Sequence, residues 1–182
     1  MNTSFDRDTN HLRLVVNWIV DIAVVISIAW FTVFTLGTQI TIAGQSMSPV
    51  LESEEVVLMN RLVYRFHRPE RFDIVAFERE DKKLNIKRVV GLPGETVQVK
   101  DGFLYIDDEI IESKDDLNKV ALAGLAENPV VLGKNEYFLL GDNRDNSEDS
   151  RFSNVGNVSK NQIKGKIWLR ISPIFHFGLI HS

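Results

Sequence analysis

The sequence predicts a mainly β domain that follows a single membrane-spanning helix at the N-terminus. Two features lead to this fold class. One is an apolar segment over residues 14–36, and the other is a series of short apolar runs, bounded by charged or turn-forming residues, through residues 37–182. Hydrophobic residues make up 44% of the chain and charged residues 25%. This composition is typical of a globular protein and argues against disorder.

The apolar segment over residues 14–36 is long enough to cross a bilayer. As a helix it would extend about 34 Å, compared with a hydrocarbon core of about 30 Å. Its charged residue, Asp21, is expected near the cytoplasmic edge, because an Asp at the bilayer centre costs about 2.5–3.5 kcal/mol. A cleavable signal peptide ending near Ala43 is the alternative, but such peptides have apolar regions of only about 7–15 residues. An uncleaved anchor is favoured.

Basic residues predict the orientation of this anchor. Arg7 and Arg13 precede it, and the next Lys or Arg is Arg61. Basic residues close to a membrane span stay on the cytoplasmic side. The predicted organisation is therefore a cytoplasmic N-terminus over 1–13, a transmembrane anchor over 14–36 and an extracytoplasmic domain over 37–182.

The outer domain contains strand-like runs along most of its length. Asp101 and Gly102 predict a tight type I′ hairpin turn, because this pair adopts the positive φ angles that the turn requires. A second turn is predicted at Asp107 and Asp108. The predicted strands cover residues 55–59, 72–77, 97–100, 103–106, 109–111, 137–140 and 163–171.

Two further stretches have no clear strand pattern. Residues 112–136 are irregular and polar, and they are predicted to form a surface excursion with a helical turn. The C-terminal apolar runs over 173–175 and 177–180 are expected to pack in the core, in preference to touching the membrane.

Charge, cysteine content and spacing exclude several functions. A net charge of −4 gives no reason to expect a nucleic-acid ligand. The absence of cysteine excludes disulfides, thiolate catalysis and Cys-ligated zinc. Residues 141–151 are rich in Asp and Asn, but an EF-hand loop counted from Asp142 would place Arg144 at a ligand position, and one counted from Asp145 lacks the glycine it needs. No metal ion and no cofactor are predicted.

A candidate nucleophile, Ser46, lies in a polar stretch just after the anchor. A serine nucleophile needs a base, and His67 lies among three basic neighbours that indicate a solvated loop. A lysine can replace histidine if burial lowers its pKa, and Lys87 is the best candidate. On a strand Lys87 and Arg88 face opposite ways, so one of them is expected to point inward while the other stays in solvent.

Three polar stretches resemble the signature boxes of the type I signal peptidases, which are membrane-bound serine proteases with a Ser/Lys dyad. Residues 46–49 resemble the nucleophile box, residues 87–95 the general-base box, and residues 141–151 the third box without a mismatch. Residues 72–77 resemble the family's strand box, with Phe72 where glycine is usual. The single anchor and short outer domain resemble the compact Gram-positive form. The resemblance implies a signal-peptidase-like coiled β-sheet as the catalytic domain.

The resemblance also implies a role for each matching residue. Ser46 would be the nucleophile, Lys87 the general base, and Ser147 the hydrogen-bond partner that orients Lys87. The oxyanion hole would rest on backbone N–H groups near Gly44 and Ser46. The residues implied to hold the geometry of the site are Asp142, Arg144, Asp149 and Arg151. The substrate would bind as an added strand along a region that comprises Gln39, Ile40, Ile42, Ala43, Leu84, Asn85 and Ile86.

The implied activity is the removal of signal peptides from secretory preproteins at the outer face of the cell membrane, with small residues in an A-x-A pattern before the cleavage site. The implied partners are these preproteins and the lipid bilayer. Two alternatives remain open. A soluble relative such as the self-cleaving SOS-response repressors is disfavoured by the anchor and the third box. A factor with a signal-peptidase fold that is catalytically silent, or dedicated to one client such as a pilin, would be distinguished by a cleavage assay.

Overall fold

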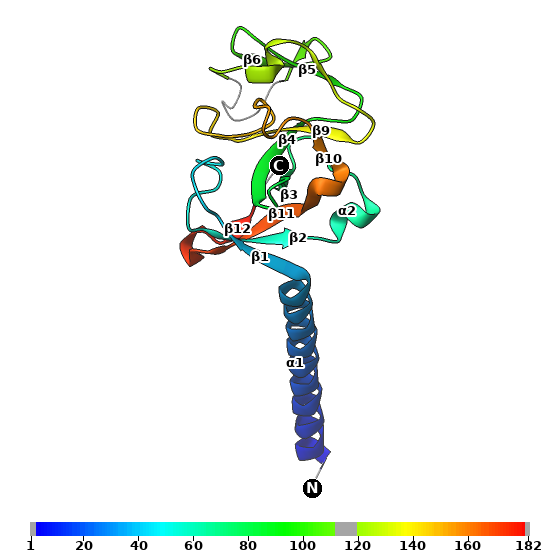
Figure 1. The fold of residues 1–182 in the computed structure, drawn as a ribbon. Coiled ribbons are helices and arrows are strands. Elements are labelled where there is room, and N and C mark those ends of the chain that lie inside the picture. Colours follow the sequence, from blue (N-terminus) through cyan, green and yellow to red (C-terminus); the bar gives the residue numbers. More distant parts are fainter. Residues whose placement is uncertain (1–2, 112–119, 181–182) are drawn as a thin grey trace. The chain divides into compact units, whose positions relative to one another are not determined.

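A computed structural model describes residues 3–111 and 120–180 and divides the chain into two units, Met1–Gly37 and Thr38–Ser182. The first unit consists of helix α1 (Thr3–Leu36) (Figure 1). Within α1, Arg13–Phe31 is long and apolar enough to cross a membrane, and none of its residues is buried. The prediction of an apolar N-terminal helix is confirmed.

The second unit is built on a curled antiparallel sheet of eight strands, in the order β1-β2-β11-β3-β4-β9-β10, with β12 paired to β11 (Figure 1). Register shifts interrupt β11 against both β2 and β3, and β4 against β9. Such bulges bend strands and increase their twist, which explains the curl of the sheet. The strands are β1 (Gly37–Thr41), β2 (Val56–Asn60), β3 (Ile74–Glu78), β4 (Leu84–Gly91), β9 (Glu136–Leu140), β10 (Val158–Ser159), β11 (Ile163–Ser172) and β12 (Gly178–Leu179).

A second, smaller sheet has the order β7-β6-β5-β8. It consists of β5 (Thr96–Lys100), β6 (Phe103–Ile106), β7 (Glu109–Ile110) and β8 (Val130–Val131). Both turns predicted here are present, and their four residues have positive φ, as type I′ turns require: Asp101 52°, Gly102 80°, Asp107 50° and Asp108 66°. The mainly β fold class is therefore confirmed.

Short helices complete the described part of the chain. They are α2 (Val63–Phe66) and the 3-10 helices η1 (Gly124–Glu127), η2 (Lys160–Gln162) and η3 (Ile174–His176). Of the predicted surface excursion, residues 112–119 lie outside the described residues. The remainder contains η1, in agreement with the predicted helical turn. It is not a surface segment throughout, because Val120, Ala126 and Leu132 are buried in the core beneath the small sheet.

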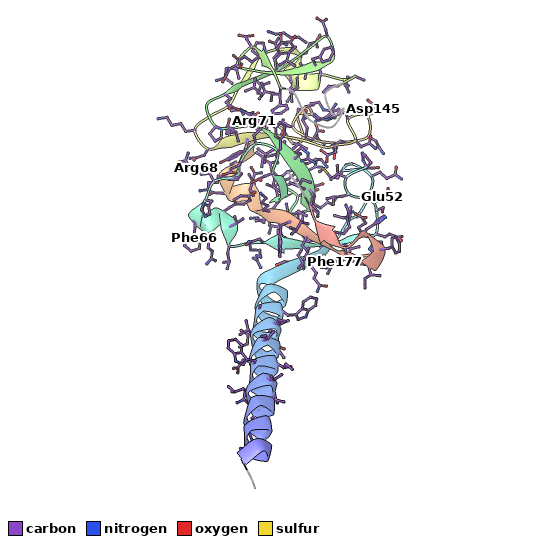
Figure 2. The ribbon with its side chains drawn as sticks, turned by 180° about the vertical axis from the view of Figure 1, so that it is seen from behind. Glu52, Phe66, Arg68, Arg71, Asp145 and Phe177 are labelled. Atoms are coloured by element: carbon purple, nitrogen blue, oxygen red, sulfur yellow. The ribbon has the colours of Figure 1, made fainter. Side chains whose placement is uncertain are left out.

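The expectation for the C-terminal apolar runs is wrong. Ile174, Phe175, Phe177 and Leu179 are exposed, and Phe177 projects from the surface of the second unit, as does Phe66 of α2 (Figure 2). Ile180 is half-buried and packs against the core. An apolar run indicates burial only where other elements cover it, and β12 pairs with β11 at the margin of the sheet.

The core that positions the candidate site lies against the large sheet. Met47 and Leu51 flank a turn that follows Ser46, and both side chains are buried. They pack with residues of β2, β3 and β11, including Val57 and Ile167. The loop between β1 and β2 is therefore fixed to the sheet by its apolar side chains.

Candidate active site

Ser46 lies in the loop between β1 and β2, and it is half-buried. The loop turns tightly after it, with Ser48 N donating to Gln45 O at 3.2 Å and Leu51 N to Met47 O at 2.8 Å. The Ser46 carbonyl accepts a hydrogen bond from Asn143 N at 3.1 Å. This bond joins the first polar stretch to the third, as their resemblance to one site predicts.

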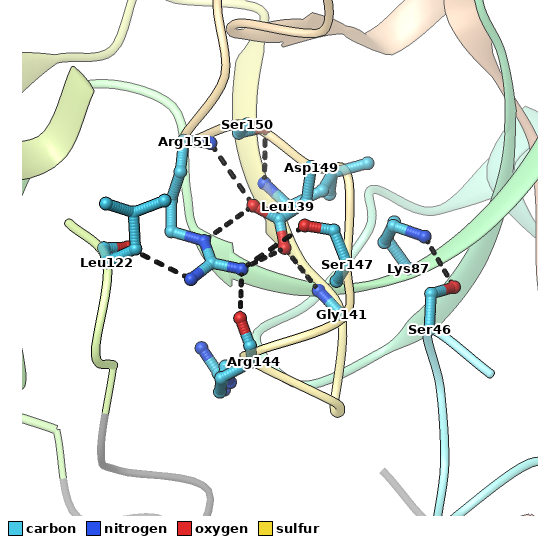
Figure 3. A network of polar contacts seen from close by, with 10 residues as sticks. All are labelled: Ser46, Lys87, Leu122, Leu139, Gly141, Arg144, Ser147, Asp149, Ser150 and Arg151. Atoms are coloured by element: carbon cyan, nitrogen blue, oxygen red, sulfur yellow. Dashed lines mark hydrogen bonds and ion pairs between the residues drawn. The ribbon is translucent and has the colours of Figure 1, made fainter. Parts of the chain in front are cut away.

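Lys87 of β4 reaches this serine. Its Nζ lies 2.8 Å from Ser46 Oγ (Figure 3). It also donates a hydrogen bond to Ile86 O at 3.2 Å. The side chain is 3% exposed. Burial lowers the pKa of Lys87 to about 8, although the nearby charge of Asp149 acts in the opposite direction. At this pKa a substantial fraction of the amine is neutral near physiological pH.

Arg88, the next residue of β4, does not stay in solvent as expected. It is 5% exposed. Its Nε and Nη2 bond the two carboxylate oxygens of Asp142 at 2.7 and 2.8 Å, and its Nη1 bonds Phe72 O at 3.0 Å. A cation on the second face of a buried strand requires such a partner, because an unpaired buried charge is costly.

A second buried ion pair organises the loop after β9. Arg151 Nε lies 2.8 Å from Asp149 Oδ1, and its Nη2 lies 3.0 Å from Oδ2 (Figure 3). The guanidinium also donates to the carbonyls of Leu122 and Arg144 at 3.0 and 2.7 Å, and more weakly to that of Ser147 at 3.4 Å. Asp149 also accepts the Gly141 N–H at 3.0 Å. The pair thus fixes both ends of the loop.

Arg144 differs from these two arginines. Within the described residues its Nε and Nη1 have no hydrogen-bond partner although they are buried. Burial lowers the pKa of Arg144 to about 10, partly offset by the charges of Asp142 and Asp149. Among the described residues it forms no direct ion pair, and the carboxylates that act on it are those of Asp142 and Asp149.

The expected hydrogen bond from Ser147 to Lys87 is not formed in this structure. Ser147 Oγ is buried and has no hydrogen-bond partner among the described residues. It lies against Gly141, where a Cβ would be 2.1 Å from Ser147 Oγ and 2.5 Å from Ser46 O. Gly141 is thus needed for these segments to meet. The motif resemblance implies no individual role for Gly141, but its place directly after a buried strand is a signal of close packing.

An open cleft of about 580 Å³ lies beside Ser46. One wall of the cleft is formed by the residues that lead up to Ser46. Among them, Gly44 has φ +87°, a conformation that favours glycine. The lining residues are Ala43, Gly44, Gln45, Ser46, Asp145, Asn146, Ser147, Glu148 and Phe152. As the described residues outline it, the cleft is not lined by the other predicted substrate residues, Gln39, Ile40, Ile42, Leu84, Asn85 and Ile86.

Those other residues nevertheless lie on strand edges. β4 pairs with β3 over residues 84–88 but with β9 only from Arg88 onward, so within the described chain residues 84–87 have no strand partner on that side. β1 is the terminal strand of the large sheet. Ile42 is tied down by backbone bonds to Glu54 and Glu55, at 2.9 and 2.8 Å. Over residues 3–111 and 120–180, no three His, Cys, Asp or Glu side chains form a group that could hold a metal ion.

A serine hydrogen-bonded to a buried lysine, beside an open cleft on a curled β-sheet, is suited to a serine hydrolase in which lysine takes the place of histidine. A family model described as signal peptidase, peptidase S26, matches residues 15–172. The chain therefore belongs to this family, and it is a hydrolase of the signal peptidase I type, which removes signal peptides from secretory preproteins.

Individual relatives agree with this assignment. The chain is 35% identical over 172 residues to signal peptidase I of Bacillus caldolyticus, covering 88% of this chain and 91% of the relative. It is 30% identical over 178 residues to signal peptidase I P of Bacillus subtilis subsp. natto, covering 93% and 96%. A crystal structure of a signal peptidase I from Enterococcus faecalis V583 matches with 31% identity and a TM-score of 0.43, covering 55% of this chain and 97% of that one.

Proposed function

We propose that this chain removes signal peptides by a Ser/Lys dyad, with Ser46 as the nucleophile and Lys87 as the general base. The observation that carries the proposal is the 2.8 Å contact between Lys87 Nζ and Ser46 Oγ, made by a lysine that is buried and bonds no carboxylate among the described residues. A lysine in such surroundings is neutral more often than one in solvent, and it can accept a proton.

The proposed reaction proceeds through an acyl-enzyme. Neutral Lys87 accepts the proton of Ser46 as Oγ attacks the scissile carbonyl, and the N–H of Ser46 beside Gly44 stabilises the developing oxyanion. Lys87 then donates this proton to the leaving amine, which departs as the N-terminus of the mature protein. A water molecule then gives a proton to Lys87 as its oxygen attacks the ester carbonyl. When the bond from Ser46 Oγ to this carbon breaks, Lys87 returns the proton to Oγ, which releases the signal peptide and restores Ser46 and neutral Lys87.

The substrate is proposed to bind as an extended strand next to the free edge of β4 over residues 84–87 and next to β1 and Ala43. Backbone bonds along these edges would align the scissile carbonyl with Ser46. Small residues in the A-x-A pattern before the cleavage site would fit the limited space around Ile42 and Ile86, which pack into the core.

The remaining motif residues are proposed to hold this geometry. Asp142 pairs with Arg88, Asp149 pairs with Arg151, and the two pairs fix the loop that carries Ser147. The catalytic domain is proposed to lie outside the cell membrane, because the basic residues that flank the apolar helix precede it.

Processing of a secretory preprotein by the full-length chain in lipid vesicles tests this proposal. Ser46→Ala and Lys87→Ala are each expected to abolish cleavage while the thermal unfolding curve still shows a folded domain. Lys83→Ala is the matched control, since Lys83 lies in the same β3–β4 hairpin but its side chain is 78% exposed, and it should cleave normally. Substantial cleavage by folded Lys87→Ala would rule out the dyad, and an inactive wild-type chain would point to a dedicated client.

A further inference from the structure

Arg79 and Glu148 form an ion pair that joins two segments beside the candidate dyad. Arg79 follows β3 in the turn to β4, and Glu148 follows Ser147 directly in the loop after β9. Arg79 Nη1 lies 2.5 Å from Glu148 Oε2. Asn154 completes the contact, since its Nδ2 donates to the other carboxylate oxygen and its carbonyl accepts from Arg79 Nη2 at 3.5 Å. Three side chains thus fasten the Ser147 segment to the hairpin that carries Lys87.

This pair differs from the two buried ion pairs in its surroundings. The Arg79 side chain is 18% exposed and that of Glu148 is 55% exposed. Glu148 also lines the open cleft beside Ser46. Glu148 therefore acts on the site through its charge and remains in contact with solvent. Asp142 and Asp149 instead form buried ion pairs with Arg88 and Arg151.

The two charges of the pair have opposite effects on Lys87. The acidic groups that favour the charged form of Lys87 are Asp149, Glu148 and Asp142, in decreasing order, while Arg79 disfavours it. Asp149 and Asp142 come from the loop after β9, and Arg79 comes from the β3–β4 turn. Arg79 and Glu148 are thus the two members of this charge set that act on Lys87 in opposite directions while pairing with each other.

We propose that Arg79 and Glu148 are positioning residues for the dyad: they fasten the Ser147 segment to the hairpin and present opposite charges to Lys87. This inference rests on the proposed role of Lys87 as the base, and it names two residues that influence the protonation of Lys87. Neither residue needs to touch the substrate's reacting atoms. Within the pair, the effect of each charge on the protonation of Lys87 is opposed by the effect of the other.

Removal of one charge at a time should move the pH profile in opposite directions. In Glu148→Gln, the protonated form of Lys87 loses a favourable charge, so the acid limb of kcat/KM should move to lower pH. In Arg79→Gln, it loses an unfavourable charge, so the limb should move to higher pH. Each shift is expected to be about 0.3–1 pH unit at low salt. The double variant should return close to the wild-type profile.

The experiment measures kcat/KM of the full-length chain on one preprotein between pH 6 and pH 10, at low salt and at 1 M salt. Both shifts should shrink at 1 M salt, because the Debye length falls from about 10 Å at 0.1 M to about 3 Å. Glu148→Asp and Arg79→Lys keep the charges and should keep the wild-type limb. Lys100→Gln and Asp108→Asn remove a comparable exposed pair on the small sheet and should shift nothing.

Exposed ion pairs contribute little to stability, so all these variants are expected to fold. Loss of activity in both single variants with an unmoved limb, or shifts in the same direction, would overturn the proposal and leave a purely structural contact. A failure of the dyad itself is distinguishable, because the wild-type chain would then lack the acid limb or folded Lys87→Ala would remain active.

Discussion

The two faces of strand β4 carry neighbouring buried basic side chains, Lys87 and Arg88, that have different hydrogen-bond partners. Lys87 is 3% exposed and contacts a hydroxyl and a carbonyl, whereas Arg88 is 5% exposed and contacts both oxygens of Asp142. The difference lies in the partner and not in the degree of burial. The two-bond contact with a carboxylate joins β4 to the loop after β9.

Among the described residues Lys87 has no carboxylate within hydrogen-bonding distance, so burial outweighs the more distant charges of Asp149, Glu148 and Asp142. Its pKa falls to about 8. Arg88 therefore holds the geometry of the site through its carboxylate partner, whereas Lys87, the proposed base, contacts neutral groups among the described residues. The Asp149–Arg151 pair belongs with Arg88 in this respect, since its bonds all serve to hold the loop.

The largest expected effect comes from breaking the Arg88 pair. Asp142→Ala leaves a buried guanidinium without its carboxylate, which should lower the free energy of unfolding by about 3–5 kcal/mol. Urea denaturation of the full chain in detergent would measure the loss. Asp81→Ala removes an exposed partner of Lys83 and should leave the urea midpoint unchanged.

A double replacement sharpens this test. Arg88→Met together with Asp142→Leu removes both charges and should recover most of the lost stability, since a packed apolar pair can replace a buried ion pair. If Asp142→Ala alone left the stability near that of the wild-type chain, the contrast between the two faces of β4 would be lost.

Replacement of Lys87, on the other face of β4, is expected to raise the free energy of unfolding. The pKa of Lys87 is lowered from 10.5 to about 8 on folding, so the folded state disfavours the proton that the unfolded chain binds. Lys87→Met should therefore raise the free energy of unfolding at pH 7 by about 2–3 kcal/mol. The gain should fade between pH 8 and pH 10.5, where the unfolded chain also loses this proton.

Unfolding of Lys87→Met and of the wild-type chain at pH 7 and at pH 10 would measure this difference. Lys83→Met, in the same hairpin but exposed, should show no pH-dependent gain. A Lys87→Met protein that is less stable than wild type at pH 7 would contradict the assignment of Lys87 as an uncompensated buried amine.

The same pKa predicts the pH dependence of activity. The base is active when neutral, so kcat/KM on a preprotein should be level above about pH 8 and fall about tenfold for each pH unit well below it. A profile measured from pH 5 to pH 9, with circular dichroism at each pH to verify the fold, would test this. A flat profile across that range would exclude Lys87 as the base.

The sequence predicted the features that depend on local pattern. The hairpin turns followed from Asp101 and Gly102, and the opposite faces of Lys87 and Arg88 followed from the two-residue period of a strand. The burial of Arg88 could not be predicted in this way. Periodicity tells which face a side chain takes, but its partner Asp142 comes from a strand-to-loop junction far along the chain.

The start of β3 shows a second limit. The apolar pattern predicted a strand from Phe72, but β3 begins at Ile74 and Phe72 has φ +69°. The backbone there is set by distant contacts, with Phe72 N donating to Val89 O at 2.7 Å and Phe72 O accepting from Arg88. A left-handed residue at this position also explains why glycine is usual there in the family that the sequence resembles. Tertiary contacts, and not local preference, decide that conformation.

The smallest expected effect concerns a pair of buried serines in the loop after β9. Ser147 Oγ has no partner among the described residues, while Ser150 Oγ accepts the Leu139 N–H at 2.9 Å. Ser150→Ala orphans a buried donor and should cost about 1–3 kcal/mol. Ser147→Ala orphans nothing and should change the free energy of unfolding by less than about 1 kcal/mol.

The effects on activity should be the reverse of those on stability, with Ser147→Ala losing more activity than Ser150→Ala. If Ser147 orients Lys87 once substrate occupies the cleft, Ser147→Ala should lower kcat by roughly tenfold or more while KM stays near the wild-type value. Preprotein cleavage and urea denaturation on the same two variants give both readouts. A Ser147→Ala protein as destabilised as Ser150→Ala would assign Ser147 to the supporting network, alongside Arg88, and leave Lys87 oriented by Ser46 and the Ile86 carbonyl.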